Sequence, residues 1–138
     1  MDFNYDTMCF ACGEQNDWGL KLKFTEKDGV VETSLIPSDV FQGYPGVMHG
    51  GLNATILDEV MARAVYAAGF NAMTARMELR YRKHVPIGQK VVYRAKIVAA
   101  RKKLYDLEAE AVLEDGSVAV EASARFMIIN EEELNGTE

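Results

Sequence analysis

Two glycines near the middle of the chain stand where backbone groups could do chemistry. Gly50 and Gly51 follow His49 at the start of a helical pattern, and the first N–H groups of a helix have no partner within it. Such a helix start attracts an anion or a developing oxyanion, and glycine lets a ligand approach the backbone closely. The alternative is a loop that needs the conformational freedom of glycine before an ordinary helix.

Two carboxylates follow about two turns further along the same pattern. Asp58 and Glu59 lie on opposite sides of its apolar stripe. Glu59 has Arg63 four positions later, in the order that favours an exposed ion pair. Asp58 has no basic residue at that spacing, and aspartate is a weak helix former in mid-helix. We therefore favour Asp58 as a general base or nucleophile, the alternative being a carboxylate simply exposed to solvent.

The residue inventory disfavours other common catalytic arrangements. None of the four serines stands in a Gly-x-Ser-x-Gly segment, and only two histidines are present. A Ser-His-Asp triad is therefore not expected. The chain also has no Gly-x-Gly-x-x-Gly or P-loop string, which is the usual cradle for a dinucleotide or a triphosphate.

The two cysteines of the chain, Cys9 and Cys12, have the spacing of half a zinc ribbon. A structural zinc site needs four ligands, and no second cysteine pair follows. A site completed by His49 and His84 would have to join distant segments. Redox activity lacks the strand–helix–strand pattern that usually surrounds such a pair. We expect no metal site here, and we interpret the cysteines as packing an N-terminal turn.

Basic residues gather in two places, although the chain as a whole is acidic. Fifteen Lys and Arg residues stand against 21 Asp and Glu, for a net charge of −6, which makes duplex nucleic acid a poor candidate partner. The local clusters are ordinarily solvated turns, and a phosphate-bearing ligand would give them a binding role. They consist of Arg80, Arg82, Lys83 and His84, and of Arg101, Lys102 and Lys103.

Hydrophobic periodicity predicts the elements that position these residues. A broad apolar stripe predicts one helix from Gly50 to Ala68, which Gly69 would cap. Alternation predicts a strand from Leu20, a hairpin turn at 28–29, and strands over 30–36, 74–84, 91–99, 107–113 and 118–128. This order indicates an α+β fold with one helix on one face of an antiparallel sheet. The other face would expose apolar surface, so we expect self-association.

Size and composition fit a single domain over residues 1–138. The 15.4 kDa chain is 49% hydrophobic and 26% charged, so a hydrophobic core can form without disulfide bonds or a structural metal. We expect a cysteine-containing N-terminal segment over 1–18 and a frayed acidic tail over 131–138. The N-terminus lacks signal-peptide features, and glycine and proline interrupt the uncharged stretch 40–57. We therefore predict no membrane span and expect a cytoplasmic location.

Several of these residues together resemble a known family. The string Cys9-Phe10-Ala11-Cys12-Gly13, followed by Asn16 and Gly19-Leu20, is similar to the N-terminal segment of many hotdog-fold thioesterases of the PaaI-like group. Residues 43–51, Gly-Tyr-Pro-Gly-Val-Met-His-Gly-Gly, are similar to the active-site loop of that group, and the spacing from there to Asp58 matches its helix. The resemblance covers residues 9–126.

This resemblance implies a hotdog fold, in which a curved antiparallel sheet wraps one central helix. It implies homodimers with a continuous sheet, often paired as dimers of dimers, and active sites at the dimer interface. By position, the amides of Gly50 and Gly51 would polarise the thioester carbonyl, and His49 would be mainly structural. Asp58 would activate water or attack the carbonyl, and Thr74 would position the water.

The resemblance implies an acyl-CoA thioesterase that needs no metal or organic cofactor. One alternative is a non-catalytic acyl-CoA or small-molecule binding protein of the same fold. A redox or zinc-binding module built on the two cysteines is less favoured. The sequence does not distinguish between aromatic, short-chain and medium-chain acyl groups of the substrate. We assign substrate binding to Gly43, Asn53, Glu59, Arg82, Lys83, Arg101 and Lys102.

Overall fold

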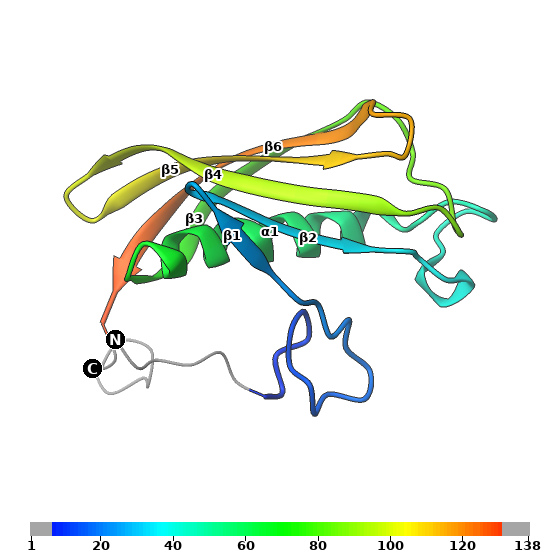
Figure 1. Ribbon diagram of the computed structural model, residues 1–138, viewed down its shortest axis with the longest axis horizontal. Helices are drawn as coiled ribbons and strands as arrows, with labels where there is room; N and C mark the ends of the chain where they lie inside the picture. The colour runs from blue at the N-terminus through cyan, green and yellow to red at the C-terminus, as the bar shows by residue number, and fades with distance from the viewer. Residues whose placement is uncertain (1–6, 131–138) are drawn as a thin grey trace.

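The computed structural model describes residues 7–130, which form a six-stranded sheet and one long helix (Figure 1). The expected tail over 131–138 lies outside this range, as do residues 1–6. Along the sheet the strands follow the order β1-β2-β4-β5-β6-β3, and all neighbours are antiparallel. The predicted α+β architecture is confirmed. Its elements are β1 (Thr25–Lys27), β2 (Val30–Leu35), η1 (Asp39–Phe41), α1 (Gly50–Ala67), β3 (Asn71–Tyr81), β4 (Val91–Arg101), β5 (Leu104–Val112) and β6 (Val118–Ile129).

Helix α1 lies against the concave face of the sheet (Figure 1). Its predicted stripe supplies the centre of the core, where Ile56, Leu57 and Val60 are completely buried. Burial of each such side chain stabilises the fold by about 1.5–3 kcal/mol. The helix ends as predicted, because Gly69 after the C-cap takes a φ of +104° that suits glycine. No helix in the described part of the chain has the length and apolarity needed to span a membrane.

The first strand starts later than the alternation from Leu20 predicts. The N–H groups of Leu20 and Leu22 donate to the carbonyl oxygens of Phe10 and Ala11, at 2.8 and 2.9 Å. Lys21 has a left-handed φ of 54°, which a continuous strand does not allow. The alternation of this segment therefore reflects packing against the N-terminal segment, and only β1 joins the sheet.

The other strands differ from the predictions mainly at their ends. The hairpin turn at Asp28 and Gly29 is confirmed, with φ values of 54° and 83° as a two-residue turn of this kind requires. β3 begins before Thr74 and ends at Tyr81 rather than at His84. It ends there because the N–H groups of residues 82 and 83 both turn to the carbonyl of Ala119.

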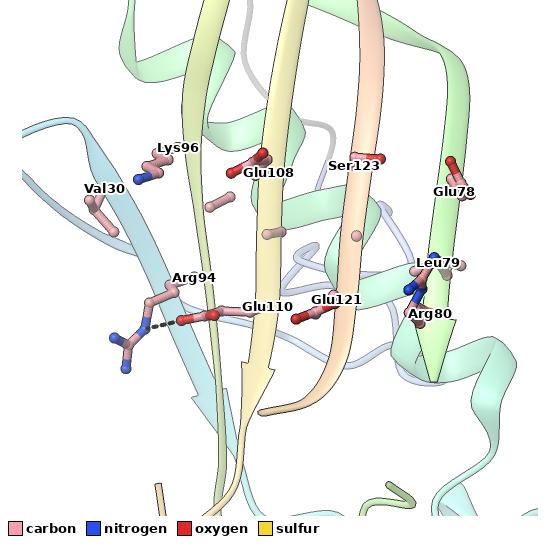
Figure 2. A pocket seen from close by; sticks show the side chains of 13 residues that line it. Val30, Glu78, Leu79, Arg80, Arg94, Lys96, Glu108, Glu110, Glu121 and Ser123 are labelled. Atoms are coloured by element: carbon pink, nitrogen blue, oxygen red, sulfur yellow. Dashed lines mark ion pairs between the residues drawn. The ribbon is translucent and has the colours of Figure 1, made fainter. Parts of the chain in front are cut away.

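The outer face of the sheet is charged, contrary to the expected apolar surface. Charged side chains of β4 and β5 point away from α1 (Figure 2). The residues that alternate with them, such as Tyr93 and Leu107, are buried in the core. Arg94 bridges Glu32 and Glu110 at 3.6 and 3.9 Å. A hollow of about 570 Å³ on this face includes Lys96, Glu108 and other outward side chains. None of the site residues predicted from the sequence lines it.

The free edge of the sheet gives a different reason for self-association. β3 is an edge strand of 11 residues, and an edge presents unpaired N–H and C=O groups to a second chain. Met73 and Tyr81 on this strand are 56% and 51% exposed. Exposed apolar side chains beside a long unpaired edge favour strand addition by another copy.

We expect light scattering to give at least a dimer, of about 31 kDa (twice 15.4 kDa), at micromolar concentration. Met73→Lys should shift the protein toward the monomer, because a charge on the edge opposes strand pairing. Val40→Lys is the control, since Val40 is 79% exposed on η1, away from β3. A wild-type protein that stays monomeric would contradict the expectation.

Candidate active site

His49 is the N-cap residue of α1 and holds the start of the helix in place. Its Nδ1 accepts a hydrogen bond from the Gly51 N–H at 2.9 Å. Its carbonyl oxygen accepts from the N–H groups of Leu52 and Asn53, at 3.0 and 3.3 Å, and its own N–H donates to Phe41 at 2.8 Å. A neutral imidazole that accepts at Nδ1 carries its proton on Nε2. His49 therefore orients the whole first turn.

The two glycine amides are not equivalent. The Gly51 N–H is occupied by His49, so the pair of free amides expected from the sequence is reduced to one. Within residues 7–130 the Gly50 N–H has no hydrogen-bond partner. The Gly50 N–H shares its peptide with the His49 carbonyl, which the N–H groups of Leu52 and Asn53 hold in place. The Gly50 carbonyl, in the next peptide, accepts from the Tyr81 hydroxyl at 2.8 Å. Gly50 therefore presents one fixed donor at the positive end of the helix dipole.

A buried hydrogen bond between Tyr93 and Asn53 holds the start of α1 against the sheet. Asn53 is 2% exposed, and its Oδ1 accepts a hydrogen bond from the Tyr93 hydroxyl at 2.5 Å. Tyr93 is itself fully buried, and burial raises its pKa, so the phenol keeps the proton that it donates. The side-chain amide of Asn53 donates to the His49 carbonyl at 3.5 Å. Asn53 thus links the N-cap to β4.

A hollow of about 360 Å³ opens beside this helix start. It brings together four predicted site residues from distant parts of the chain, Gly50, Asn53, Arg82 and Lys83. The hollow is also lined by Tyr81, which sequence reasoning missed because it is 31 positions from Gly50. Its complete lining is Val47, Met48, Gly50, Asn53, Tyr81, Arg82, Lys83, His84 and Val85.

Gly43, also assigned to substrate binding, lies against His49 outside the lining of this hollow. Its N–H donates to the Val47 carbonyl at 2.9 Å within the loop that precedes α1. A Cβ at this position would stand 3.3 Å from the His49 Cα, which is a tight contact. The structure thus gives Gly43 a packing role beside the N-cap.

Asp58 lies two turns along α1 and faces β3. The Thr74 hydroxyl donates to its Oδ1 at 2.5 Å. A β-bulge between Thr74 and Arg76 allows this contact, because it sends Thr74 toward the helix side while Arg76 pairs with the outward Arg125. The second carboxylate oxygen has no hydrogen-bond partner in the described part of the chain, so it can take a proton from a ligand or water.

Gly50 and Asp58 of one chain are separated along the helix. Eight positions at 1.5 Å each place them about 12 Å apart along the axis. A reacting carbonyl must lie about 3 Å from both its hydrogen-bond donor and its attacking group. One chain therefore supplies two half-sites that do not meet on the same carbonyl.

Glu59 is not the exposed residue that its spacing to Arg63 suggested. Its side chain is only 12% exposed, because the N-terminal segment with Cys9 and Cys12 covers this side of α1. Arg63 Nε lies 3.8 Å from its Oε2. Burial raises the pKa of Glu59, and the neighbouring Cys12 and Arg63 act in the opposite sense. Glu59 is also absent from the lining of the hollow, contrary to its assignment to substrate binding.

Arg101 and Lys102 lie at the opposite end of the molecule from Gly50. They belong to the β4–β5 hairpin, which reaches the C-terminal end of α1 (Figure 1). At that end the rings of Phe70 and Tyr105 lie 5.8 Å apart. Within one chain, therefore, the two basic clusters do not form one site.

One helix wrapped by a six-stranded antiparallel sheet is the architecture of a hotdog-fold protein. The thioesterase superfamily model matches residues 45–120, more than half of the chain, and the chain belongs to this superfamily. Acyl-coenzyme A thioesterase THEM4 of Mus musculus is 30% identical over 93 residues, which cover 66% of this chain and 40% of that protein. This chain thus spans about two fifths of the length of that relative.

Solved structures show the same fold. The crystal structure of a thioesterase superfamily protein has a TM-score of 0.83 and 24% identity, covering 88% of this chain and 60% of that one. A Streptococcus mutans UA159 protein, solved bound to acetyl CoA, has a TM-score of 0.75 and 17% identity, covering 79% of this chain and 89% of that one. At these identities the likeness concerns the fold.

The brace beneath the helix start can be tested by Tyr93→Phe. This change leaves the buried Oδ1 of Asn53 without its donor, so unfolding in urea should show a loss of about 1–3 kcal/mol. Tyr44→Phe is the control, because Tyr44 is 83% exposed and should change stability by less than about 0.5 kcal/mol. Equal stability of the two variants would show that the hydroxyl contact contributes nothing.

Proposed function

We propose that the protein hydrolyses acyl-CoA thioesters to the free acid and CoA. The observation that carries this is the fixed, unpartnered Gly50 N–H at the start of α1, combined with the Asp58–Thr74 pair. Thioester cleavage needs a donor for the developing oxyanion and a base or nucleophile. Membership of the thioesterase superfamily and the similarity to an acyl-coenzyme A thioesterase support the same reaction.

The two halves of the site would come from two copies of the chain. Asp58 lies beside β3, the edge strand that carries Thr74. Antiparallel pairing of two β3 strands would extend the sheet and set the two α1 helices side by side in opposite directions. The start of one helix would then lie near the Asp58 of the other. A homodimer with two equivalent sites follows from this symmetry.

In this site the Gly50 N–H would donate to the thioester oxygen as negative charge develops there. Water would form the new C–O bond, the C–S bond would break, and the CoA thiolate would take up a proton. Asp58 would act in one of two ways. It would take the proton of the attacking water, or it would itself attack the carbonyl and expel the CoA thiolate, giving a mixed anhydride that water then hydrolyses to the free acid and the Asp58 carboxylate. Thr74 holds the carboxylate through Oδ1 in both cases, which leaves its other oxygen for the reaction.

The hollow beside Gly50 is suited to the phosphate end of CoA. Arg82 and Lys83 line it together with His84, and guanidinium and ammonium groups bind phosphate through charge-assisted hydrogen bonds. In the antiparallel dimer, the partner's β4–β5 hairpin would reach the same end of α1. The Arg101 and Lys102 of that hairpin would then join the cluster. The acetyl CoA bound to the Streptococcus mutans neighbour supports a ligand of this class.

The choice of Asp58 is tested by Asp58→Asn, which keeps the shape of the side chain and removes the base. In a thiol-release assay over a panel of acyl-CoA substrates, kcat should fall by about 10²–10⁴-fold with little change in KM. Glu78→Gln is the matched control, because Glu78 is an exposed carboxylate on the outer face of β3. Binding of acyl-CoA without turnover by the wild-type protein would instead favour a non-catalytic binding protein.

The assignment of the basic residues is tested by Arg82→Gln combined with Lys83→Gln. KM should rise by about two- to fivefold with kcat nearly unchanged, because these contacts hold substrate and transition state alike. The difference should shrink in high salt, which screens exposed charges. Lys96→Gln, a change on the outer face of the sheet, should leave KM unaltered. An unchanged KM in the double variant would show that Arg82 and Lys83 do not bind the substrate and are simply solvated.

A further inference from the structure

The N-terminal segment brings two thiols against a carboxylate of α1. One ligand atom each of Cys9, Cys12 and Glu59 lies within 4.8 Å of the other two. The Gly13 N–H donates to the Cys9 carbonyl at 2.8 Å and closes the turn between the cysteines. A Cβ on Gly13 would meet backbone atoms of Thr7 and Cys9 at 2.3 and 2.5 Å, so this tight turn requires glycine.

One carboxylate oxygen in this cluster is buried without a hydrogen-bond partner in the described part of the chain. Oε2 of Glu59 is shielded from solvent and accepts no hydrogen bond within the described residues. Its nearest cation, Arg63 Nε, is 3.8 Å away, beyond hydrogen-bond distance. A buried carboxylate oxygen in this state is costly, which points to a further group that binds it.

A divalent cation is compatible with the charges around this oxygen. On binding a metal the two thiols would lose their protons, and a divalent ion together with Arg63 would neutralise the resulting two thiolates and the carboxylate. Arg63 is held in place, because its guanidinium lies 4.6 Å from the centre of the Phe24 ring.

We propose that Cys9, Cys12 and Glu59 bind one Zn²⁺ ion, with water as the fourth ligand. Thiolate and carboxylate oxygen are both zinc ligands, and three protein ligands with one water make a tetrahedral site. Zn–S bonds of about 2.3 Å and Zn–O bonds of about 2.0–2.2 Å draw the ligand atoms to about 3.5–3.8 Å from one another. Binding displaces the two thiol protons and leaves every oxidation state unchanged.

This site is independent of thioester hydrolysis. Glu59 faces the N-terminal segment, while the adjacent Asp58 faces β3 on the other side of α1. The ion would tie the segment that precedes β1 to the middle of the helix, which is a structural role. From the sequence, only cysteine and histidine were considered as zinc ligands. Glu59 lies far along the chain from Cys9 and Cys12, and only the fold brings it next to them.

The test is metal content and cobalt spectroscopy of the full chain. Protein purified from zinc-supplemented medium should hold about one zinc per chain by plasma mass spectrometry. Cobalt added to chelator-treated protein under reducing conditions should give thiolate-to-cobalt charge-transfer bands and the visible bands of tetrahedral cobalt. Cys9→Ser, Cys12→Ser and Glu59→Gln should each lower the zinc retained after dialysis at least tenfold. Glu14→Gln should not, since Glu14 lies in the same segment but pairs with Lys23 at the surface.

The zinc content and cobalt spectrum of the wild-type protein test the site even if a variant fails to fold. Less than a tenth of a zinc per chain, with no thiolate-to-cobalt band in wild-type protein whose thiols are reduced, would overturn it. Iron or copper in stoichiometric amount would overturn the choice of zinc. Full zinc retention by Glu59→Gln would overturn the glutamate as a ligand. Loss of zinc without loss of thioesterase activity would still support the site, because its role is structural.

Discussion

The hydrogen bond from the Gly51 N–H to the His49 ring is the contact on which the candidate active site depends. It fixes the first turn of α1 and occupies one amide, so that of the two glycine N–H groups only that of Gly50 has no partner within the described residues. The contact also explains the glycines around it. A Cβ on Gly51 would lie 3.1 Å from the His49 ring, and a Cβ on Gly43 would lie 3.3 Å from the His49 Cα. Tyr81 then holds the Gly50 carbonyl from β3, so the peptide between Gly50 and Gly51 is fixed at both its carbonyl and its N–H.

Helix α1 separates two carboxylates that are adjacent in sequence. At about 100° per residue, Asp58 and Glu59 point to different neighbours. Asp58 faces Thr74 beside an open sheet edge, where water and a second chain can reach it. Glu59 is covered by the N-terminal segment, where loss of solvation raises its pKa while Arg63 and Cys12 lower it. The two carboxylates therefore differ in their access to solvent, which the spacing of Glu59 to Arg63 does not show.

Much of the fold could be predicted because its signals are local. The stripe of α1, the two-residue turn at Asp28 and Gly29, and the alternation of four later strands all arise within short windows of sequence. The errors arise from contacts between distant segments. Leu20 and Leu22 alternate like a strand but pair with the N-terminal segment, and Glu59 has the spacing of an exposed ion pair but is covered by it. The Tyr81–Gly50 contact spans 31 positions and leaves no local pattern.

The edge strand β3 links assembly to chemistry. Its bulge after Thr74 turns that hydroxyl toward Asp58, and its end places Tyr81 over the Gly50 carbonyl. The same strand leaves a row of backbone groups free for a second chain. Because the amide and the carboxylate of one chain are about 12 Å apart along α1, the proposed hydrolytic site would require the partner that this edge would recruit. A strand that both orients the two half-sites and joins the two copies would make the dimer the smallest active unit.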